Sequence, residues 1–112
     1  MSKKIKKSTI AFEIHFYEGI LKRSPDFVEA LMALGDLYTG IGRFEEGLHV
    51  DLHLERLRPE DPVILYNLAC SYSLTNQINL AYRTIKRAVN CGYDDFAHLE
   101  KARDLDNLHK DL

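Results

Sequence analysis

The residue spacing that comes nearest to a chemical site is a pair of histidines four positions apart. On a helix, His49 and His53 would share one face, where two imidazoles can bind one zinc ion. A zinc site also needs a third placed ligand, and the glutamate of an HExxH motif is missing as well. The pair alone therefore predicts no metal site.

The two cysteines, Cys70 and Cys91, offer little nucleophilic chemistry. A catalytic thiol needs a basic neighbour that lowers its pKa, and neither such a neighbour nor a histidine base is placed beside Cys70. Two cysteines in 112 residues are also too few for a disulfide scaffold. We expect two free thiols in a reducing compartment, with Cys70 as a small packing residue.

Paired acidic residues recur along the chain and resemble catalytic carboxylates. Each pair stands where we expect a helix to begin, and negative charge there caps free N–H groups and complements the helix dipole. The sequence also lacks a glycine-rich phosphate loop and a nucleophile elbow. We expect no enzymatic activity and no cofactor. The pairs are Glu45 and Glu46, Glu60 and Asp61, and Asp94 and Asp95.

Length and charge limit the classes of partner. The chain has 112 residues, 46% of them apolar and 29% charged, which suits one domain with a modest core and no membrane span. Four lysines stand in residues 1–7, so residues 8–112 carry 11 basic against 17 acidic side chains. An acidic body lacks the cationic face that nucleic-acid binding requires. We expect a protein or peptide partner, no nucleic acid and no membrane.

Lysines followed by an apolar stretch raise the question of a secretory signal. The apolar stretch, residues 10–21, is interrupted by Glu13, His15 and Glu18, and no small-residue cleavage site follows it. We therefore expect residues 1–7 to form a basic, flexible end and the protein to be cytoplasmic.

An internal repeat of 34 residues organises the rest of the chain. Apolar residues recur at three- and four-residue steps in each copy, which predicts two helices per copy. The positions that fall on one another are Leu31 and Leu65, Leu34 and Leu68, Gly35 and Ala69, Tyr38 and Tyr72, Phe44 and Ile78, Gly47 and Ala81, and Leu54 and Ala88.

Breaker residues divide each copy in two. Gly40 and Gly42 interrupt the first copy and residues 75–77 the second, at the point where an antiparallel helical hairpin needs its turn. Between Leu48 and Leu54 the apolar residues alternate as in a strand. We still predict helix there, because a lone strand would have no partner for its backbone groups.

The repeated positions resemble the tetratricopeptide repeat (TPR) family, over most of the chain. The resemblance implies an all-α fold of antiparallel helical hairpins, stacked as a short right-handed superhelix. Small residues at the repeated positions would let the helix axes approach closely. The residues that carry the resemblance are Leu31, Leu34, Gly35, Tyr38, Gly47, Leu54 and Pro59 in one copy, and Leu65, Leu68, Ala69, Tyr72, Ala81 and Ala88 in the next.

The expected organisation is a single domain over residues 8–112. The last segment departs from the repeat pattern, and we expect its helix to break near Arg103 and Asp104, with Leu105 and Leu108 completing a lid. The expected parts are an unpaired helix (8–23), repeat 1 (26–59), repeat 2 (60–93) and a C-terminal capping helix (94–112).

Asp51 departs from the family pattern, which has a large apolar or aromatic side chain at that position. A buried carboxylate needs a hydrogen-bond donor, and Tyr38 or Tyr66 would be the nearest candidate. A slightly turned helix would instead leave Asp51 in water.

The resemblance implies a concave groove, lined by the first helix of each hairpin, that receives an extended peptide or a partner's helix. Tyr66 and Asn67 are the leading contact residues, because an aromatic ring gives contact area and a carboxamide both donates and accepts hydrogen bonds. Alternatively, Tyr66 only packs between the hairpins and Asn67 is solvated. The expected groove residues are Met32, Asp36, Thr39, Val63, Tyr66, Asn67, Cys70 and Ser73.

The N-terminal helix carries apolar residues on more than one face. The stripe of Ile10, Ile14, Tyr17 and Leu21 can pack on the first hairpin. A second stripe consists of Phe12, Phe16 and Ile20, and the helix that would cover it is absent from this chain. We expect self-association or a protein partner to bury it. The alternative is that it folds against the lysine-rich start.

Two functions follow from these patterns. The leading hypothesis is an adaptor or scaffold module that binds a peptide or protein segment in its groove. The alternative is a structural assembly protein that forms a homodimer through its N-terminal helix, with its groove empty or filled by its own tail.

Overall fold

The fold is known from a computed structural model that describes residues 2–101 and 103–106. Over these residues the chain is all-helical, as predicted. The elements are α1 (Ser2–Arg23), α2 (Val28–Gly40), α3 (Phe44–Leu57), α4 (Pro62–Leu74), α5 (Ile78–Asn90), α6 (Phe96–Lys101) and the 3₁₀ turn η1 (Arg103–Leu105).

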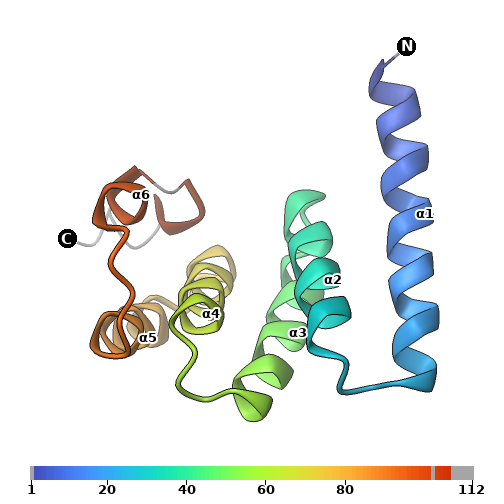
Figure 1. Ribbon diagram of the computed structural model, residues 1–112. Helices are drawn as coiled ribbons and strands as arrows, with labels where there is room; N and C mark the ends of the chain where they lie inside the picture. Colours follow the sequence, from blue (N-terminus) through green and yellow to red (C-terminus); the bar gives the residue numbers. More distant parts are fainter. Residues whose placement is uncertain (1, 102, 107–112) are drawn as a thin grey trace.

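The first five helices lie side by side in chain order (Figure 1). Each of them packs against the next, and η1 packs against α4. The pairs α2–α3 and α4–α5 form two helical hairpins, which fall within residues 26–59 and 60–93. The array therefore begins with a single helix, α1, and ends with a short segment that returns to the second hairpin.

The two hairpins turn in the same way, 34 residues apart. Gly42 follows α2 with a φ of 85° and Asn76 follows α4 with a φ of 62°, in the left-handed region that glycine and asparagine tolerate best. In both turns the N-cap residue of the next helix donates its backbone N–H to the carbonyl of the equivalent tyrosine, Tyr38 or Tyr72, at 2.8 Å. The sequence repeat is thus a repeat of backbone geometry.

Acidic residues at two helix starts act as caps, as expected. The Asp61 carboxylate caps α4 by accepting from the backbone N–H of Val63 at 2.9 Å and of Ile64 at 3.2 Å. At α6 the carboxylate of Asp95 accepts from the backbone N–H of His98 at 3.0 Å. These contacts give both carboxylates a structural role at the start of a helix.

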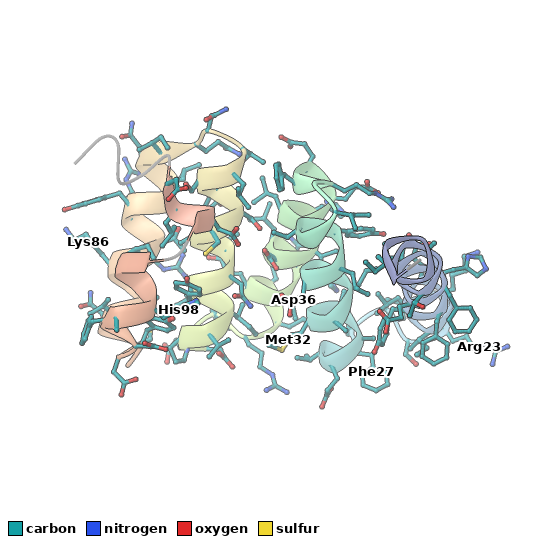
Figure 2. All side chains as sticks on the ribbon, turned by 90° about the horizontal axis from the view of Figure 1, so that it is seen from above. Arg23, Phe27, Met32, Asp36, Lys86 and His98 are labelled. Atoms are coloured by element: carbon teal, nitrogen blue, oxygen red, sulfur yellow. The ribbon has the colours of Figure 1, made fainter. Side chains whose placement is uncertain are left out.

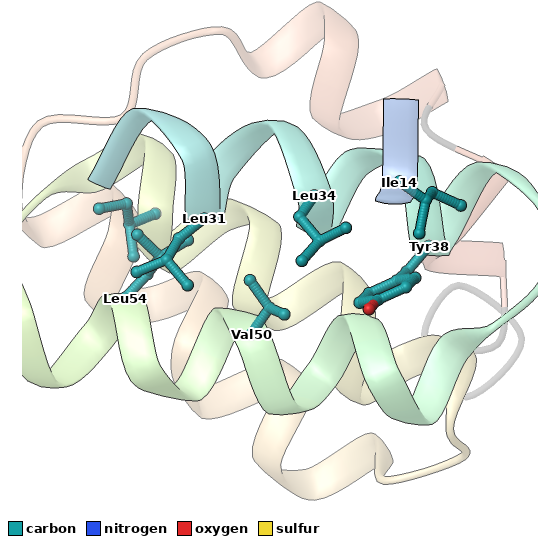
Figure 3. Packing of buried hydrophobic residues seen from close by; sticks show 7 residues of the cluster. Ile14, Leu31, Leu34, Tyr38, Val50 and Leu54 are labelled. Carbon is teal, nitrogen blue, oxygen red and sulfur yellow. The ribbon is translucent and has the colours of Figure 1, made fainter. Parts of the chain in front are cut away.

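The first core cluster lies among α1, α2 and α3 and extends to the start of α4 (Figure 3). Gly47 lets α2 and α3 meet, because a Cβ at that position would lie only 2.7 Å from Thr39 Oγ1. The buried members are Ile14, Leu31, Leu34, Tyr38, Val50, Leu54 and Ile64. The alternating stretch from Leu48 to Leu54 lies inside α3, so the helix predicted there is confirmed.

α1 differs from the prediction at its start. The helix begins at Ser2 and not at residue 8, so the lysine-rich start that we expected to be a flexible end is part of it. Lysine is a good helix former, and no proline or glycine occurs before Gly19, so nothing in the sequence stops the helix earlier. Among the helices of the described residues, none is both long enough and apolar enough to cross a membrane.

The last described segment breaks where the sequence predicted. α6 ends at Lys101 and η1 begins at Arg103. Leu105 is fully buried in a second cluster, whose other buried members are Leu65, Tyr66, Cys70 and Ala88. Leu108, the other expected lid residue, lies outside the described residues. The segment from α6 to η1 therefore covers part of α4.

Candidate functional site

A polar cavity of about 440 Å³ opens between the first helices of the two hairpins. Four of the eight predicted groove residues line it, namely Asp36 and Thr39 from α2 and Asn67 and Cys70 from α4. Viewed from above, Met32 and Asp36 lie on the side of α2 that faces α4 (Figure 2). The other lining residues are Gly40, Phe44, Asp51, Ser71, Leu74 and Asp104.

Three carboxylates give this cavity its charge. Asp36 comes from α2, Asp51 from α3 and Asp104 from η1. Burial raises the pKa of all three, and the charge of Asp104 raises the pKa of Asp36 further. Among the residues that line the cavity, none is a lysine, an arginine or a histidine. The cavity is therefore an electronegative, partly desolvated site.

Asp51 is buried, but the tyrosine partner predicted for it is wrong. Its Oδ2 accepts a hydrogen bond from Ser71 Oγ at 2.5 Å. Tyr38 instead donates its hydroxyl to Glu18 Oε2 at 2.5 Å, because α1 lies against that end of α2. Desolvation and, to a lesser degree, the charge of Asp36 raise the pKa of Asp51 to about 7, although the Ser71 hydrogen bond lowers it.

Tyr66 packs inside the protein, against residues from the C-terminal part of the chain. Its ring stacks on Tyr93 with 4.6 Å between centroids, and the His98 ring lies 5.5 Å away. Only 7% of Tyr66 is exposed. Figure 2 shows His98 reaching from α6 toward α4. The C-terminal segment thus occupies the part of the inner face where a partner was expected to meet Tyr66.

A second cavity, of about 510 Å³, lies beside this covered region. Val63 and Asn67 line it together with Tyr66, and Val63 is 47% exposed. Across the cavity stand residues 92–95, which connect α5 to α6. Asn67 borders both cavities, so it is the predicted residue best placed to contact a ligand that spans them.

Two predicted groove residues, Met32 and Ser73, line neither cavity. Ser73 is fully buried, so its side chain does not reach the groove surface. Met32 is half-buried and packs against the first core cluster. Both lie on the expected helices, but helical spacing alone does not say how deeply a neighbouring hairpin buries each turn.

Cys70 lines the first cavity as a buried and protonated thiol. Desolvation raises its pKa to about 12, although a hydrogen bond with the Tyr66 hydroxyl acts to lower the pKa. A thiol that stays protonated at neutral pH is a poor nucleophile, in keeping with its expected packing role. Both Cys70 and Cys91 are free, as predicted.

Asp104 is the site residue that sequence reasoning missed. Only the docking of Leu105 brings it to the cavity, and a non-repeating tail carries no periodic signal for such a position. Asp51 was singled out as a departure from the pattern but was not placed in the groove. The signal that could have placed it in the site is its charge at a position where the repeat pattern has an apolar residue.

Two of the three residues in the outer stripe on α1 are exposed in the single chain. Phe12 is 69% exposed and Phe16 53%, while Ile20 is half-buried. The opposite stripe packs on the first core cluster through Ile10, Ile14, Tyr17 and Leu21. The alternative, in which the outer stripe folds against the lysine-rich start, does not fit, because residues 2–23 form one continuous helix.

One member of the histidine pair, His53, takes part in surface contacts. His53 Nε2 lies 2.9 Å from Asp26 Oδ1, and Arg56 Nη2 lies 3.1 Å from its Nδ1. His49 is exposed. Within the part of the chain that the structure describes, no group of three histidine, cysteine or acidic side chains is placed to hold a metal ion.

Similarity to a known protein extends over most of the chain. No protein-family model matches the sequence. The chain is 33% identical over 92 residues to a protein of Arabidopsis thaliana whose name describes it as chloroplastic, and the match covers 80% of this chain. The same match covers 26% of the plant protein, so the chain spans about a quarter of its length.

Proposed function

We propose that this protein is a TPR-like adaptor that binds a segment of another protein between its two hairpins. The observation that carries the proposal is the cavity between α2 and α4, where Asp36, Thr39, Asn67 and Cys70 converge from two repeats. Recognition sites of this kind are concave and carry a few convergent polar groups.

The repeat geometry supports the family resemblance behind this proposal. Equivalent turns at Gly42 and Asn76, and hairpins that pack in chain order, are what a stack of TPR-like units would show. The right-handed superhelix is part of the same proposal. Two hairpins give a short array, so we expect modest affinity.

The charge of the cavity favours a basic side chain in the partner. A lysine or arginine would offset the repulsion among Asp36, Asp51 and Asp104 and would find no competing cation in the lining. Asn67 can donate to and accept from the partner's backbone beside it. We therefore propose a protein or peptide partner with a basic residue, and no nucleic acid.

The remaining parts of the proposal concern chemistry and compartment. The Cys70 thiol is a poor nucleophile and no histidine lines the cavity, so we propose a binding protein and not an enzyme, with no cofactor. Free thiols at Cys70 and Cys91 suit a reducing compartment, and we propose the cytoplasm. The chloroplast location in the name of the plant relative is a statement about that protein.

Binding to an array of immobilised peptides tests the proposal. We expect peptides with a central lysine or arginine to be retained in preference to matched peptides with glutamate. The double variant Asp36→Asn, Asn67→Ala should lose this preference, whereas Arg83→Ala, on the exposed face of α5, should keep it. Equal retention of basic and acidic peptides, or an unaffected double variant, would exclude the cavity as the site.

A further inference from the structure

The outward face of α1 has the spacing of a helix-pairing seam. Thr9, Phe12, Phe16, Gly19 and Arg23 follow one another at alternating steps of three and four residues, as in a heptad repeat. All five are exposed. The stripe that packs on the first hairpin lies on the opposite side of the helix. Because α1 stands at one end of the array, a second helix can approach this seam without meeting the body of the protein (Figure 1).

We propose that the seam pairs with the same seam of a second copy of this chain, α1 against α1, in antiparallel orientation. The contact is isologous, so one surface serves both copies and the assembly closes as a dimer. It involves none of the cavity residues and does not depend on the proposed peptide binding.

Shape complementarity selects the second copy and its register. A Cβ at Gly19 would meet nothing within 4 Å, so this position is an open notch in the seam. In the antiparallel register centred between Tyr17 and Glu18, Phe16 of one copy faces Gly19 of the other. Phe12 then faces Arg23, where a guanidinium can lie over the ring. Each exposed ring meets either the notch or a cation.

Charge selects the antiparallel orientation over the parallel one. Arg23 lies in the seam itself, in the last turn of α1. A parallel pair in register would place Arg23 of one copy beside Arg23 of the other. An antiparallel pair places the two guanidinium groups at opposite ends of the seam, each beside a Phe12 ring. Like charges are then kept apart across the dimer.

The buried area predicts a weak dimer. A phenylalanine side chain contributes about 150–250 Å² when fully buried. From the exposures of Phe12 and Phe16, the four rings of a dimer would bury roughly 500 Å², about half of what a specific interface requires. Ile20 and the aliphatic stems of Lys22 and Arg23 flank the rings and supply further area. We expect association that depends on protein concentration.

Analytical ultracentrifugation over a wide concentration range tests the pairing. The wild type should pass from monomer to dimer. Gly19→Leu fills the notch and should raise the dimer dissociation constant by about tenfold or more, without loss of thermal stability in the monomer. Phe16→Glu should abolish dimerisation. Tyr82→Glu, which changes an exposed aromatic residue on α5, is the control and should leave the dimer intact.

Cross-linking tests the orientation. We would mix the variants Phe12→Cys and Arg23→Cys, in a background in which alanine replaces Cys91, under mild oxidation. An antiparallel dimer joins the two variants to each other, whereas a parallel dimer joins each variant to itself. A wild type that stays monomeric at the highest concentration, a Gly19→Leu dimer of unchanged affinity, or predominant self-linking would overturn the proposal.

Discussion

Asp51 and Ser71 form a buried polar pair that joins the two hairpins. The hydroxyl of Ser71 on α4 donates to the Asp51 carboxylate on α3 at 2.5 Å, and the two residues are 6% and 2% exposed. Nothing basic stands beside the pair in the adjoining cavity. The boundary between the hairpins therefore contains a buried carboxyl group with no basic residue beside it in the cavity. The stability of this boundary should depend on pH.

We expect stability to fall as the pH rises from about 4 to about 7. Burial raises the pKa of Asp51 from 3.8 to about 7, so in this window the folded protein keeps a proton that the unfolded chain has lost. Deprotonation then favours the unfolded state, by at most about 1.4 kcal/mol for each pH unit. The contribution is fully present below the lower value and is lost above the higher one. Urea unfolding at a series of pH values measures it.

The variant Asp51→Asn isolates this effect. Its amide oxygen can still accept from Ser71 but does not titrate, so the slope between pH 4 and 7 should become shallower. Asp36 and Asp104, whose pKa values are also raised, act in the same direction in both proteins. Identical slopes for the wild type and the variant would show that Asp51 does not titrate in this range.

Enlarging the small residues between α4 and α5 should weaken the second hairpin. Ala69 and Ala81 are both fully buried, so a leucine at either position must displace its neighbours. We expect a loss of about 1–3 kcal/mol for each substitution. Thermal unfolding followed by circular dichroism measures the loss. Ala11→Leu, at an exposed position on α1, should change little, and harmless substitutions at both buried sites would contradict close helix packing.

A substitution at Gly47 tests the close contact between α2 and α3. Gly47→Ala places a methyl group 2.7 Å from Thr39 Oγ1, which is too close for the present geometry. We expect a lower midpoint of urea unfolding for this variant. Adding Thr39→Ala removes the hydroxyl and should restore part of the stability. A double variant no more stable than Gly47→Ala alone would assign the loss to another cause.

The C-terminal segment can be followed through a buried thiol. Cys70 shares a cluster with Leu105, so Leu105→Asp should release the segment and expose the thiol. With alanine in place of Cys91, we expect labelling by a thiol reagent to become at least about tenfold faster, because protection reflects how often the segment opens. Ala97→Asp, at an exposed site on α6, serves as the control. Equal labelling rates in both variants would mean that Leu105 does not hold the segment.

The helices could be predicted because their signals repeat. The offset of 34 residues links each turn to its copy, and local periodicity assigns α2 to α5 without knowledge of any distant contact. The strand-like run in α3 could be assigned to a helix because a lone strand would have no partner for its backbone groups. Helix formation depends on local spacing, which a sequence records directly.

The partners of individual side chains were harder to predict. Whether Asp51 meets a tyrosine or Ser71 depends on how the two hairpins tilt against each other. Tyr66 is covered by Tyr93 and His98, which belong to the non-repeating end of the chain. Periodicity places a residue on a face of its helix, but it does not say which distant segment will cover that face.

The late position of Leu105 also affects the order in which the protein forms on the ribosome. Chains are made at about 5–20 residues per second, and domains fold from the N-terminus as they emerge. The first hairpin can complete its core once residue 64 is available, because Ile64 is the last member of that cluster. The second hairpin must wait for Leu105. About a second of synthesis separates residue 90 from Leu105, and until then the second hairpin lacks the residue that completes its buried cluster.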